Sequence, residues 1–397
     1  MTADVLPGDM AHRFDSMSIG GIGVVSGYGW GRERLWQGLL TGKPAARLYP
    51  GYGPERDQHA WVGRVPDGGD PVYGTGLFGR AVFAAAAEAV ADATARGWRQ
   101  AGRTVGLVHG ITLGDVADWR DFYLLDHGHR RPRGYLPLLH STPISVVQQE
   151  FGFHGLSMNV SAACSSGSAA LLTAKMWRDL GVVDDVLCVT TDISATPEML
   201  DHFVRMGAAV ADADPFTACR PFQEGSLGFT IAEASAAFLL TDAVEAPYAR
   251  LLGGAMTNDA HHVVSIEPTH THVIDCVRRA LSTAGVDAAE VAYVNAHGTG
   301  TRQCDAAERD VLTTVFADRP VITALKPLLG HCQGASAAVE VAAIALSYER
   351  GLAISAPTVA PAHPRLLDGS APIIDGPTVK LSMGMGGNNA AVVLAGA

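Results

Sequence analysis

Cys164 is the residue whose neighbours best suit nucleophilic chemistry. It lies in the segment NVSAACSSG, which runs directly into the helix-forming sequence SAALLTAKMWRDLG. That order predicts a strand-to-helix turn, where free N–H groups and the positive end of the helix dipole stabilise a thiolate and lower the pKa of the thiol. The small neighbours would let a substrate approach. The alternative is a buried structural cysteine, the usual role of an unpaired one.

His297 and His331 each occur in a glycine-containing turn. His297 opens HGTGT after an apolar run, so Thr299 and Thr301 offer hydroxyl groups at the end of a predicted strand, where α/β folds place functional loops. His331 lies in KPLLGHCQGASAAVE. A single histidine is more often structural than catalytic, but one cysteine with two histidines is a consistent set for nucleophilic catalysis.

A zinc site built from the same cysteine and histidines is the rival interpretation. Such sites normally show short ligand pairs such as C-x-x-C, which this sequence lacks around these residues. We therefore expect no metal ion.

A glycine-rich segment near the end of the sequence, MGMGGNN, begins at Met383 and lies between two predicted strands. Consecutive glycines permit positive φ angles and can turn backbone N–H groups into a cavity, as an oxyanion site requires. The spacing alone fits an ordinary hairpin turn equally well.

The elements that must position these residues alternate between strands and helices. Helices are predicted for residues 32–41, 77–96 and 272–285. Strands are predicted for residues 18–26, 103–110, 186–191, 236–241, 291–298, 321–324, 378–381 and 390–394. This alternation predicts an α/β fold whose strands are covered on both faces, with one helix-then-strand unit occurring twice. We expect two similar halves joined near residues 242–248.

The composition excludes several classes of protein. The formal charge is −11 and no run of Lys or Arg occurs, which argues against nucleic acid or an anionic membrane as a partner. No segment is apolar for long enough to be a signal peptide or to span a bilayer. Six scattered cysteines fit reduced thiols, most of them in or near the core, better than a disulfide framework. The sequence thus predicts a soluble, cytoplasmic protein.

Six segments together resemble the β-ketoacyl-carrier-protein synthases, the ketosynthases of the thiolase superfamily, and they occur in that family's order. They are IGGIGVVSGYGWGRERLWQGLLTGKPA, SAACSSGSAAL, ACRPFQEGSLGFTIAEASAAFLL, NAHGTGTRQCDAAE, KPLLGHCQGASAAVE and MGMGGNNAAVVL. The resemblance implies a five-layered α-β-α-β-α fold of two pseudo-repeated halves. Residues 1–245 would carry the nucleophile and residues 246–397 both histidines. It also implies a dimer, with itself or with a ketosynthase-like subunit, and an acyl carrier protein as partner.

The resemblance further implies roles for individual residues. Cys164 matches the nucleophile that takes an acyl group as a thioester, and His297 and His331 match the pair that promotes malonyl decarboxylation. Lys326 matches the motif lysine. The positions that support the site are matched by Asp305, Glu233 and Glu340. Those that bind pantetheine are matched by Thr299 and Thr301. The oxyanion hole and gating loop are matched by Met383, Met385, Gly386 and Gly387. No cofactor would be bound permanently, because the phosphopantetheine arm of the carrier protein brings the substrate.

Several positions depart from the family's pattern. Methionine replaces the usual Phe at 383 and 385, Asn388 replaces Thr, and Cys304 replaces Asn. Methionine is longer and softer than Phe, so these changes would reshape the gate to the acyl pocket. They leave open a second step other than decarboxylative condensation, such as cyclisation or formation of an ester or amide. A non-catalytic chain-length-type partner is a third possibility, which the intact Cys164 argues against.

Carrier proteins are usually acidic, so an acidic enzyme needs a local basic patch to bind one. The densest basic group in the sequence consists of Arg130, Arg131 and Arg133. The sequence does not place this group relative to the mouth of the active site.

Overall fold

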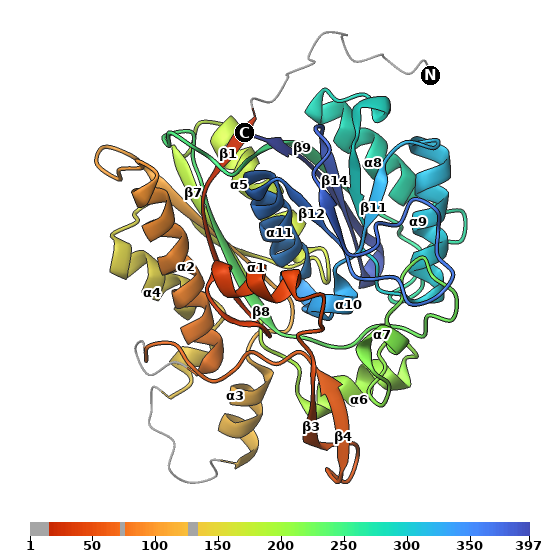
Figure 1. Cartoon of the computed structure of the whole chain (residues 1–397). Helices are drawn as coiled ribbons and strands as arrows, with labels where there is room; N and C mark the ends of the chain where they lie inside the picture. The colour runs from red at the N-terminus through yellow and green to blue at the C-terminus, as the bar shows by residue number, and fades with distance from the viewer. Residues whose placement is uncertain (1–15, 72–75, 126–133) are drawn as a thin grey trace, which may run out of the picture.

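The computed structural model describes residues 16–71, 76–125 and 134–397 (Figure 1). The basic group at Arg130, Arg131 and Arg133 lies outside these ranges. The main feature is a large mixed sheet. Apart from β2 (Gly29–Trp30), which pairs with one end of β1 (Met17–Ser26), its strands fall into two sets of five. The two sets meet where β1 pairs antiparallel with β9 (Ala249–Asn258).

The first set of strands has β1 at the junction of the two sets. The order outward from it is β1, β8 (Ala234–Leu240), β7 (Asp185–Asp192), β5 (Val105–Ile111) and β6 (Ser157–Val160). The first two pairings are antiparallel and the last two are parallel. Strands β1, β5, β7 and β8 are buried along their whole length, which explains their nearly continuous apolar sequences.

The second set repeats this pattern from β9. Its order outward is β9, β15 (Asn388–Gly396), β14 (Thr378–Gly384), β10 (Tyr293–Asn295) and β11 (Val321–Thr323). Again the first two pairings are antiparallel and the last two are parallel. The repeated pairing pattern confirms the expectation of two similar halves, whereas a boundary between residues 245 and 246 stays a prediction.

Helices form three layers around and between the two sets of strands. Helix α2 (Leu77–Ala95) packs on β1, β8 and β7, and α8 (Thr271–Ala284) packs on β9 and β15 with α9 (Arg302–Val315) beside it. Helices α5 (Ser166–Asp179) and α11 (Ser336–Arg350) lie in the middle of the molecule, and α11 is seen at its centre in Figure 1. The arrangement is the five-layered α-β-α-β-α fold that the sequence predicts.

The central helices approach closely because their facing residues are small. A Cβ atom on Gly167 would lie 2.8 Å from the backbone nitrogen of Ala338, so only glycine fits at this contact. Helix α11 is buried over residues 336–347, which is why it is rich in alanine and lacks a polar face.

The remaining elements connect or flank these layers. They are β2 (Gly29–Trp30), α1 (Arg32–Leu40), β3 (Arg47–Tyr52), β4 (Gln58–Val62), α3 (Val116–Arg120), α4 (Ser141–Phe151), α6 (Pro197–Arg205), α7 (Pro215–Ala218), α10 (Lys326–Leu329), β12 (Leu352–Ile354) and β13 (Ser370–Pro372). The helices and strands predicted from the sequence are all present, with ends that differ by a few residues.

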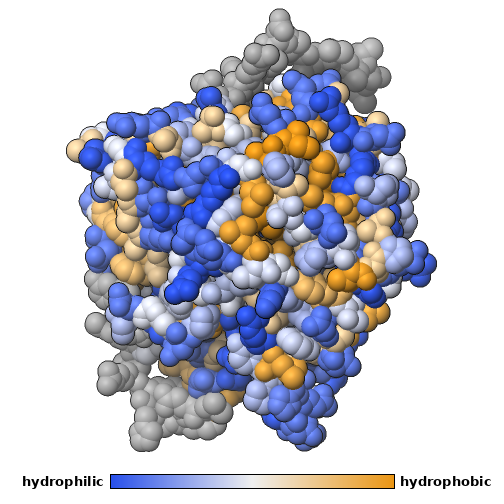
Figure 2. Space-filling view, viewed as in Figure 1, coloured by the Kyte–Doolittle hydropathy of each residue, from blue (hydrophilic) through white to orange (hydrophobic). Residues whose placement is uncertain are grey.

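The surface in the view of Figure 1 mixes hydrophilic and hydrophobic residues. Hydrophobic residues gather over the region of α11, β12 and β14 (Figure 2). A small cavity of about 20 Å³ lies beneath, lined by residues such as Tyr293, Tyr348 and Ile354, and it is too small for a substrate.

No helix in the described part of the chain is both long and apolar enough to cross a bilayer.

Candidate active site

Cys164 lies in the turn between β6 and α5, as predicted. The turn is tight, because Ala163 has a positive φ of 50°. Its backbone is held by hydroxyl groups: Thr112 Oγ1 donates to the Ala163 carbonyl at 2.8 Å, and Ser166 Oγ accepts from the Ala162 N–H at 2.9 Å. A strained residue that its surroundings hold in place is typical of functional sites.

His331 contacts the sulfur directly. It lies between α10 and α11, and its Nε2 atom is 3.2 Å from Cys164 Sγ. The other ring nitrogen, Nδ1, is 2.8 Å from the hydroxyl of Ser336. The ring of Phe229 packs edge-on against the imidazole, with 4.7 Å between ring centroids. The imidazole is therefore fixed on two sides with one nitrogen facing the thiol.

His297 follows β10 and lies next to His331, as the third of the residues predicted to act together with Cys164. Its ring centroid lies 5.6 Å from that of His331, and the two rings are nearly perpendicular, at 86°. The turn that presents it is held by Glu308, whose carboxylate accepts from the N–H groups of His297 and Gly298 at 2.6 and 2.9 Å. Glu308 was not predicted from the sequence, although it lies three residues after Asp305 and hence on the same side of α9.

A buried ionic group lies beside the two histidines. Lys326 Nζ donates to Glu340 Oε1 at 2.9 Å, and Lys380 Nζ pairs with the other oxygen, Oε2. All three side chains are at most 1% exposed. Lys326 and Glu340 were predicted, whereas Lys380 was missed, although a lysine inside an apolar strand is an unusual feature of the sequence.

The glycine-rich segment forms both the hairpin between β14 and β15 and one wall of the site. A Cβ atom on Gly384 would lie 2.7 Å from the Ala162 carbonyl and 3.1 Å from the Cys164 nitrogen, so the two backbones are in close contact. The backbone N–H of Met385 acts to lower the pKa of the Cys164 thiol. The hairpin and oxyanion interpretations are thus compatible.

Cys164, both histidines and both threonines line one cavity of about 210 Å³. The threonine hydroxyl groups, on Thr299 and Thr301, are 3.0 Å apart. The lining also includes Met383 and Met385 and several residues not predicted: Met206, Gly207, Ala208, Phe229, Val264, Ile266, Arg302, Gln303, Cys304 and Gly384. The tertiary structure therefore gathers segments that are more than two hundred residues apart.

The other predicted residues support the surrounding loops and do not line this cavity. Glu233 accepts from the N–H groups of Val65 and Ala195, and Asp305 accepts from that of Phe222 at 2.9 Å. Gly386 and Gly387 have φ angles of 79° and 73° and anchor the hairpin, since the Gly386 N–H donates to the Val263 carbonyl. Their functional roles stay predictions.

Burial controls the ionisation of the site. Burial raises the pKa of the Cys164 thiol to about 12, although Lys326 and the Met385 N–H act in the opposite direction. The expectation of a lowered thiol pKa is therefore wrong, because the loss of water on burial outweighs the groups that act to lower the pKa. Burial, aided by Lys326 and Lys380, also holds the pKa of both imidazoles well below the usual range. At neutral pH the thiol and both imidazoles are uncharged.

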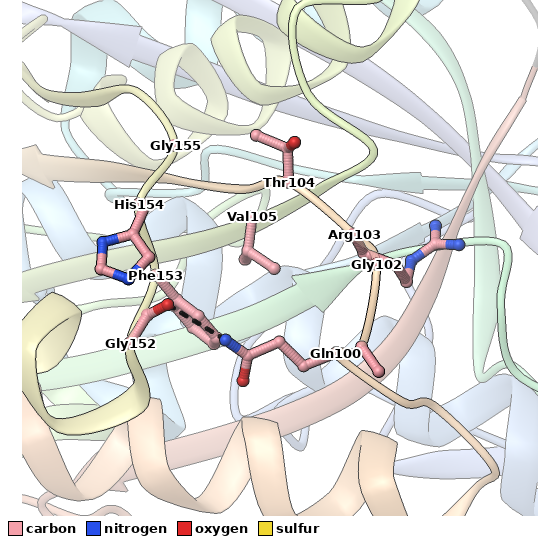
Figure 3. A pocket seen from close by; sticks show the side chains of 10 residues that line it. Gln100, Gly102, Arg103, Thr104, Val105, Gly152, Phe153, His154 and Gly155 are labelled. Atoms are coloured by element: carbon pink, nitrogen blue, oxygen red, sulfur yellow. Dashed lines mark hydrogen bonds between the residues drawn. The ribbon is translucent and has the colours of Figure 1, made fainter.

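A larger hollow lies elsewhere on the molecule but carries no comparable chemistry. It has a volume of about 680 Å³ and lies between residues 100–105 and 152–155 (Figure 3). Gln100 there donates to the Gly152 carbonyl, and the Arg103 guanidinium is paired with Asp185. Within the ranges that the structure describes, no group of three or more His, Cys, Asp or Glu side chains is arranged to hold a metal ion.

Comparison with known families places these residues in context. Residues 75–246 match the N-terminal domain of beta-ketoacyl synthases, and residues 248–359 match the C-terminal domain of the same enzymes. The oxytetracycline polyketide putative beta-ketoacyl synthase 1 of Streptomyces rimosus is 30% identical over 373 residues, which cover 86% of each chain. This chain belongs to the β-ketoacyl synthase family.

Other β-ketoacyl synthases are similar at lower identity. The putative mitochondrial 3-oxoacyl-[acyl-carrier-protein] synthase of Schizosaccharomyces pombe is 26% identical, over 84% of this chain and 86% of its own. A type II polyketide ketosynthase solved with its acyl-carrier protein has a TM-score of 0.83 at 23% identity, covering 96% of this chain and 99% of its own. The ishigamide ketosynthase/chain length factor has a TM-score of 0.84 at 24% identity, covering 96% and 99%. The structural likeness shows that this β-ketoacyl synthase has the thiolase-like fold of those enzymes.

Proposed function

We propose that this β-ketoacyl synthase loads an acyl group onto Cys164 from a carrier protein and condenses it with a malonyl-type thioester, with loss of CO₂. The observation that carries the proposal is the contact of 3.2 Å between Cys164 Sγ and His331 Nε2, inside a cavity that His297 also lines. The first step is acyl transfer, and the second is carbon–carbon bond formation.

In the first step the Cys164 sulfur attacks the thioester carbonyl of the carrier-bound acyl group. Because the thiol is uncharged at neutral pH, its proton moves to His331 Nε2 as the new S–C bond forms. The bond from the acyl carbon to the carrier's sulfur then breaks, and that sulfur leaves with the proton. The N–H groups of Cys164 and Met385 are suited to stabilise the oxyanion formed on the way.

In the second step a malonyl thioester enters the same cavity. Its C–C bond to the carboxylate breaks, CO₂ leaves, and the electron pair forms an enolate. An N–H group of an uncharged imidazole can hydrogen-bond the enolate oxygen, so charge is stabilised where it develops. For His331 this requires the tautomer in which Nε2 carries the hydrogen and Nδ1 accepts from the Ser336 hydroxyl. The enolate carbon attacks the acyl carbonyl, the bond from the acyl carbon to the Cys164 sulfur breaks, and the thiolate takes up one proton from water.

The carrier protein and a second ketosynthase subunit are part of the proposal. Thr299 and Thr301, at the wall of the cavity, would hydrogen-bond the phosphopantetheine arm. We propose a dimer with either an identical chain or a chain-length-type subunit. A reducing compartment, the cytoplasm, suits the six free cysteines, five of them buried.

Intact-mass spectrometry tests the first step. Incubation with acyl-carrier protein should make the enzyme heavier by one acyl group, and Cys164→Ala should abolish the adduct. Cys188→Ala is the matched control, because Cys188 is also buried but lies within β7. An adduct that survives Cys164→Ala, or none on the wild type, contradicts acyl loading.

Measuring CO₂ release from a malonyl donor tests the second step. Release that depends on prior acylation supports decarboxylative condensation. Product formation without a malonyl donor instead supports ester or amide formation or cyclisation, which the unusual methionines at 383 and 385 leave open. Full product formation in a reconstituted pathway with Cys164→Ala would identify a non-catalytic partner.

A further inference from the structure

Lys380 is a wholly buried cation in a strand that contributes Val379, Leu381 and Met383 to the core. Its exposed fraction is 0%, and it lies in β14, three residues before Met383 of the cavity wall. Burying an ammonium group is costly unless it is paired and hydrogen-bonded. Its position therefore calls for an explanation within the molecule.

Its ammonium group makes two hydrogen bonds and one ion pair, which link three parts of the site. The Nζ atom donates to the carbonyl groups of Ala296 and Leu381 at 3.1 and 2.9 Å. It also pairs with Glu340 Oε2. Ala296 immediately precedes His297, so the bond to its carbonyl holds the backbone from which the imidazole projects.

Glu340 extends this link to the loop of the other histidine. The same carboxylate accepts from Lys326 through Oε1 at 2.9 Å. Lys326 opens α10, which ends directly before the turn that carries His331, and Glu340 lies on α11, which follows that turn. Lys380 thus joins the His297 turn to the elements on both sides of His331.

We propose that Lys380 is a positioning residue of the catalytic centre, which fixes the His297 turn against the Lys326 and Glu340 ion pair. The proposal rests on the proposed function, because its consequence is a correct spacing of the two imidazoles around the enolate. Lys380 makes no contact with the Cys164 sulfur among the hydrogen bonds of the described residues, so it serves the second step more than acyl loading.

The charge of Lys380 has a second effect on the imidazoles. Its positive field, with that of Lys326, adds to burial in lowering the pKa of both His297 and His331. The charged or titratable groups around the imidazoles are Lys326, Lys380, Glu340, Glu308 and Cys164. Removal of one cation raises the pKa of the imidazoles, so they become protonated at a higher pH when the solution is acidified.

The test compares Lys380→Met, which keeps the length without the charge, with Lys380→Gln, which keeps a hydrogen-bond donor. Loading of Cys164 should change much less than CO₂ release in both variants. The kcat for CO₂ release should fall roughly tenfold or more in Lys380→Met with little change in KM, and less in Lys380→Gln, because orientation contributes strongly to such steps. The acidic limb of the pH profile of kcat should move to higher pH in both variants.

Lys175→Met is the matched control, because Lys175 is also buried but pairs with Asp179 on α5. It should leave kcat and the pH profile unchanged. An unchanged kcat and acidic limb in both Lys380 variants would overturn the inference. The inference would also be overturned if acyl loading and CO₂ release fell equally in both Lys380 variants, and in proportion to the loss of folded protein measured by circular dichroism. A wild-type enzyme that neither forms the adduct nor releases CO₂ would instead refute the proposed function.

Discussion

The hydroxyl group of Ser336 lies 2.8 Å from Nδ1 of His331, the ring nitrogen that faces away from Cys164. Both side chains are buried, so the hydroxyl takes the place of water at this nitrogen. A hydroxyl group can accept a hydrogen bond from a protonated Nδ1 or donate one to an unprotonated Nδ1. It therefore gives this atom a hydrogen-bond partner in either tautomer of the ring.

Ser336→Ala should slow the overall condensation roughly tenfold, because an unsatisfied buried polar atom costs about 1–3 kcal/mol. Ser336→Thr keeps a hydroxyl group and should be closer to the wild type. Steady-state kcat with carrier-bound substrates is the measurement. Equal activity of the Ala variant and the wild type would show that the ring does not depend on this contact.

The two histidines should differ in which step they affect. His331→Ala should slow both acyl loading and CO₂ release, because His331 contacts the sulfur. His297→Ala should slow chiefly CO₂ release. General acid–base and hydrogen-bonding groups contribute roughly 100- to 10,000-fold, so each loss should be readily measured. Single-turnover mass spectrometry and a CO₂ assay separate the steps, and the same loss of loading in both variants would contradict this division.

Alkylation should report the raised pKa of Cys164. Because only the thiolate reacts and burial raises the pKa to about 12, its reaction with iodoacetamide should be slow at neutral pH. The rate should rise about tenfold per pH unit up to the limit of stability, without a plateau. Peptide mapping identifies the labelled cysteine, with Cys164→Ala as the blank. A plateau near neutral pH would indicate a thiolate stabilised by the helix N-terminus instead.

Gly384→Ala should disrupt the nucleophile's turn. The added methyl group would lie 2.7 Å from the Ala162 carbonyl and 3.1 Å from the Cys164 nitrogen, and both are backbone atoms that cannot rotate away. Acyl loading should fall by at least about tenfold, since misplacement by roughly 1 Å can cost about 100-fold. Loading rates with circular dichroism as a check on folding test this. Wild-type loading would show that the hairpin can shift without cost.

The free energy of unfolding should fall as the pH rises, because Asp192 is buried as a protonated carboxyl group. It is fully buried, and burial raises its pKa to about 7 despite hydrogen bonds from Ser194 and from the N–H groups of Leu113 and Gly334. A carboxyl group whose pKa is higher in the folded state than in the unfolded state stabilises the fold while it is protonated. For Asp192 this stability is fully present below the unfolded pKa and is lost as the pH rises through about 7.

The free energy of unfolding from urea titrations at about pH 5 and about pH 7 measures this effect. Asp192→Asn cannot ionise, so its stability should fall less than that of the wild type over this range, by roughly 1 kcal/mol for each pH unit. Comparing the two proteins cancels the contributions of other groups. An identical pH dependence would show that Asp192 is not protonated in the folded enzyme.

The kinds of residue at the site and the order of the elements could be inferred from the amino-acid sequence alone. Small residues around Cys164, glycine turns at His297 and His331, and apolar runs between helices indicated the nucleophile's turn and the two-half fold. These features are local, because turn chemistry and strand or helix periodicity depend on neighbouring residues. They could therefore be predicted without coordinates.

The distances between the catalytic groups and their ionisation depend on the packing of the folded molecule. A contact between Cys164 and His331 joins residues 167 positions apart, and no local pattern fixes that spacing. The thiol pKa was predicted in the wrong direction because a helix N-terminus is visible in sequence, whereas the degree of burial is a property of the packed molecule. Lys380, Glu308 and Ser336 were missed for the same reason, since their importance comes from the partners to which the fold brings them.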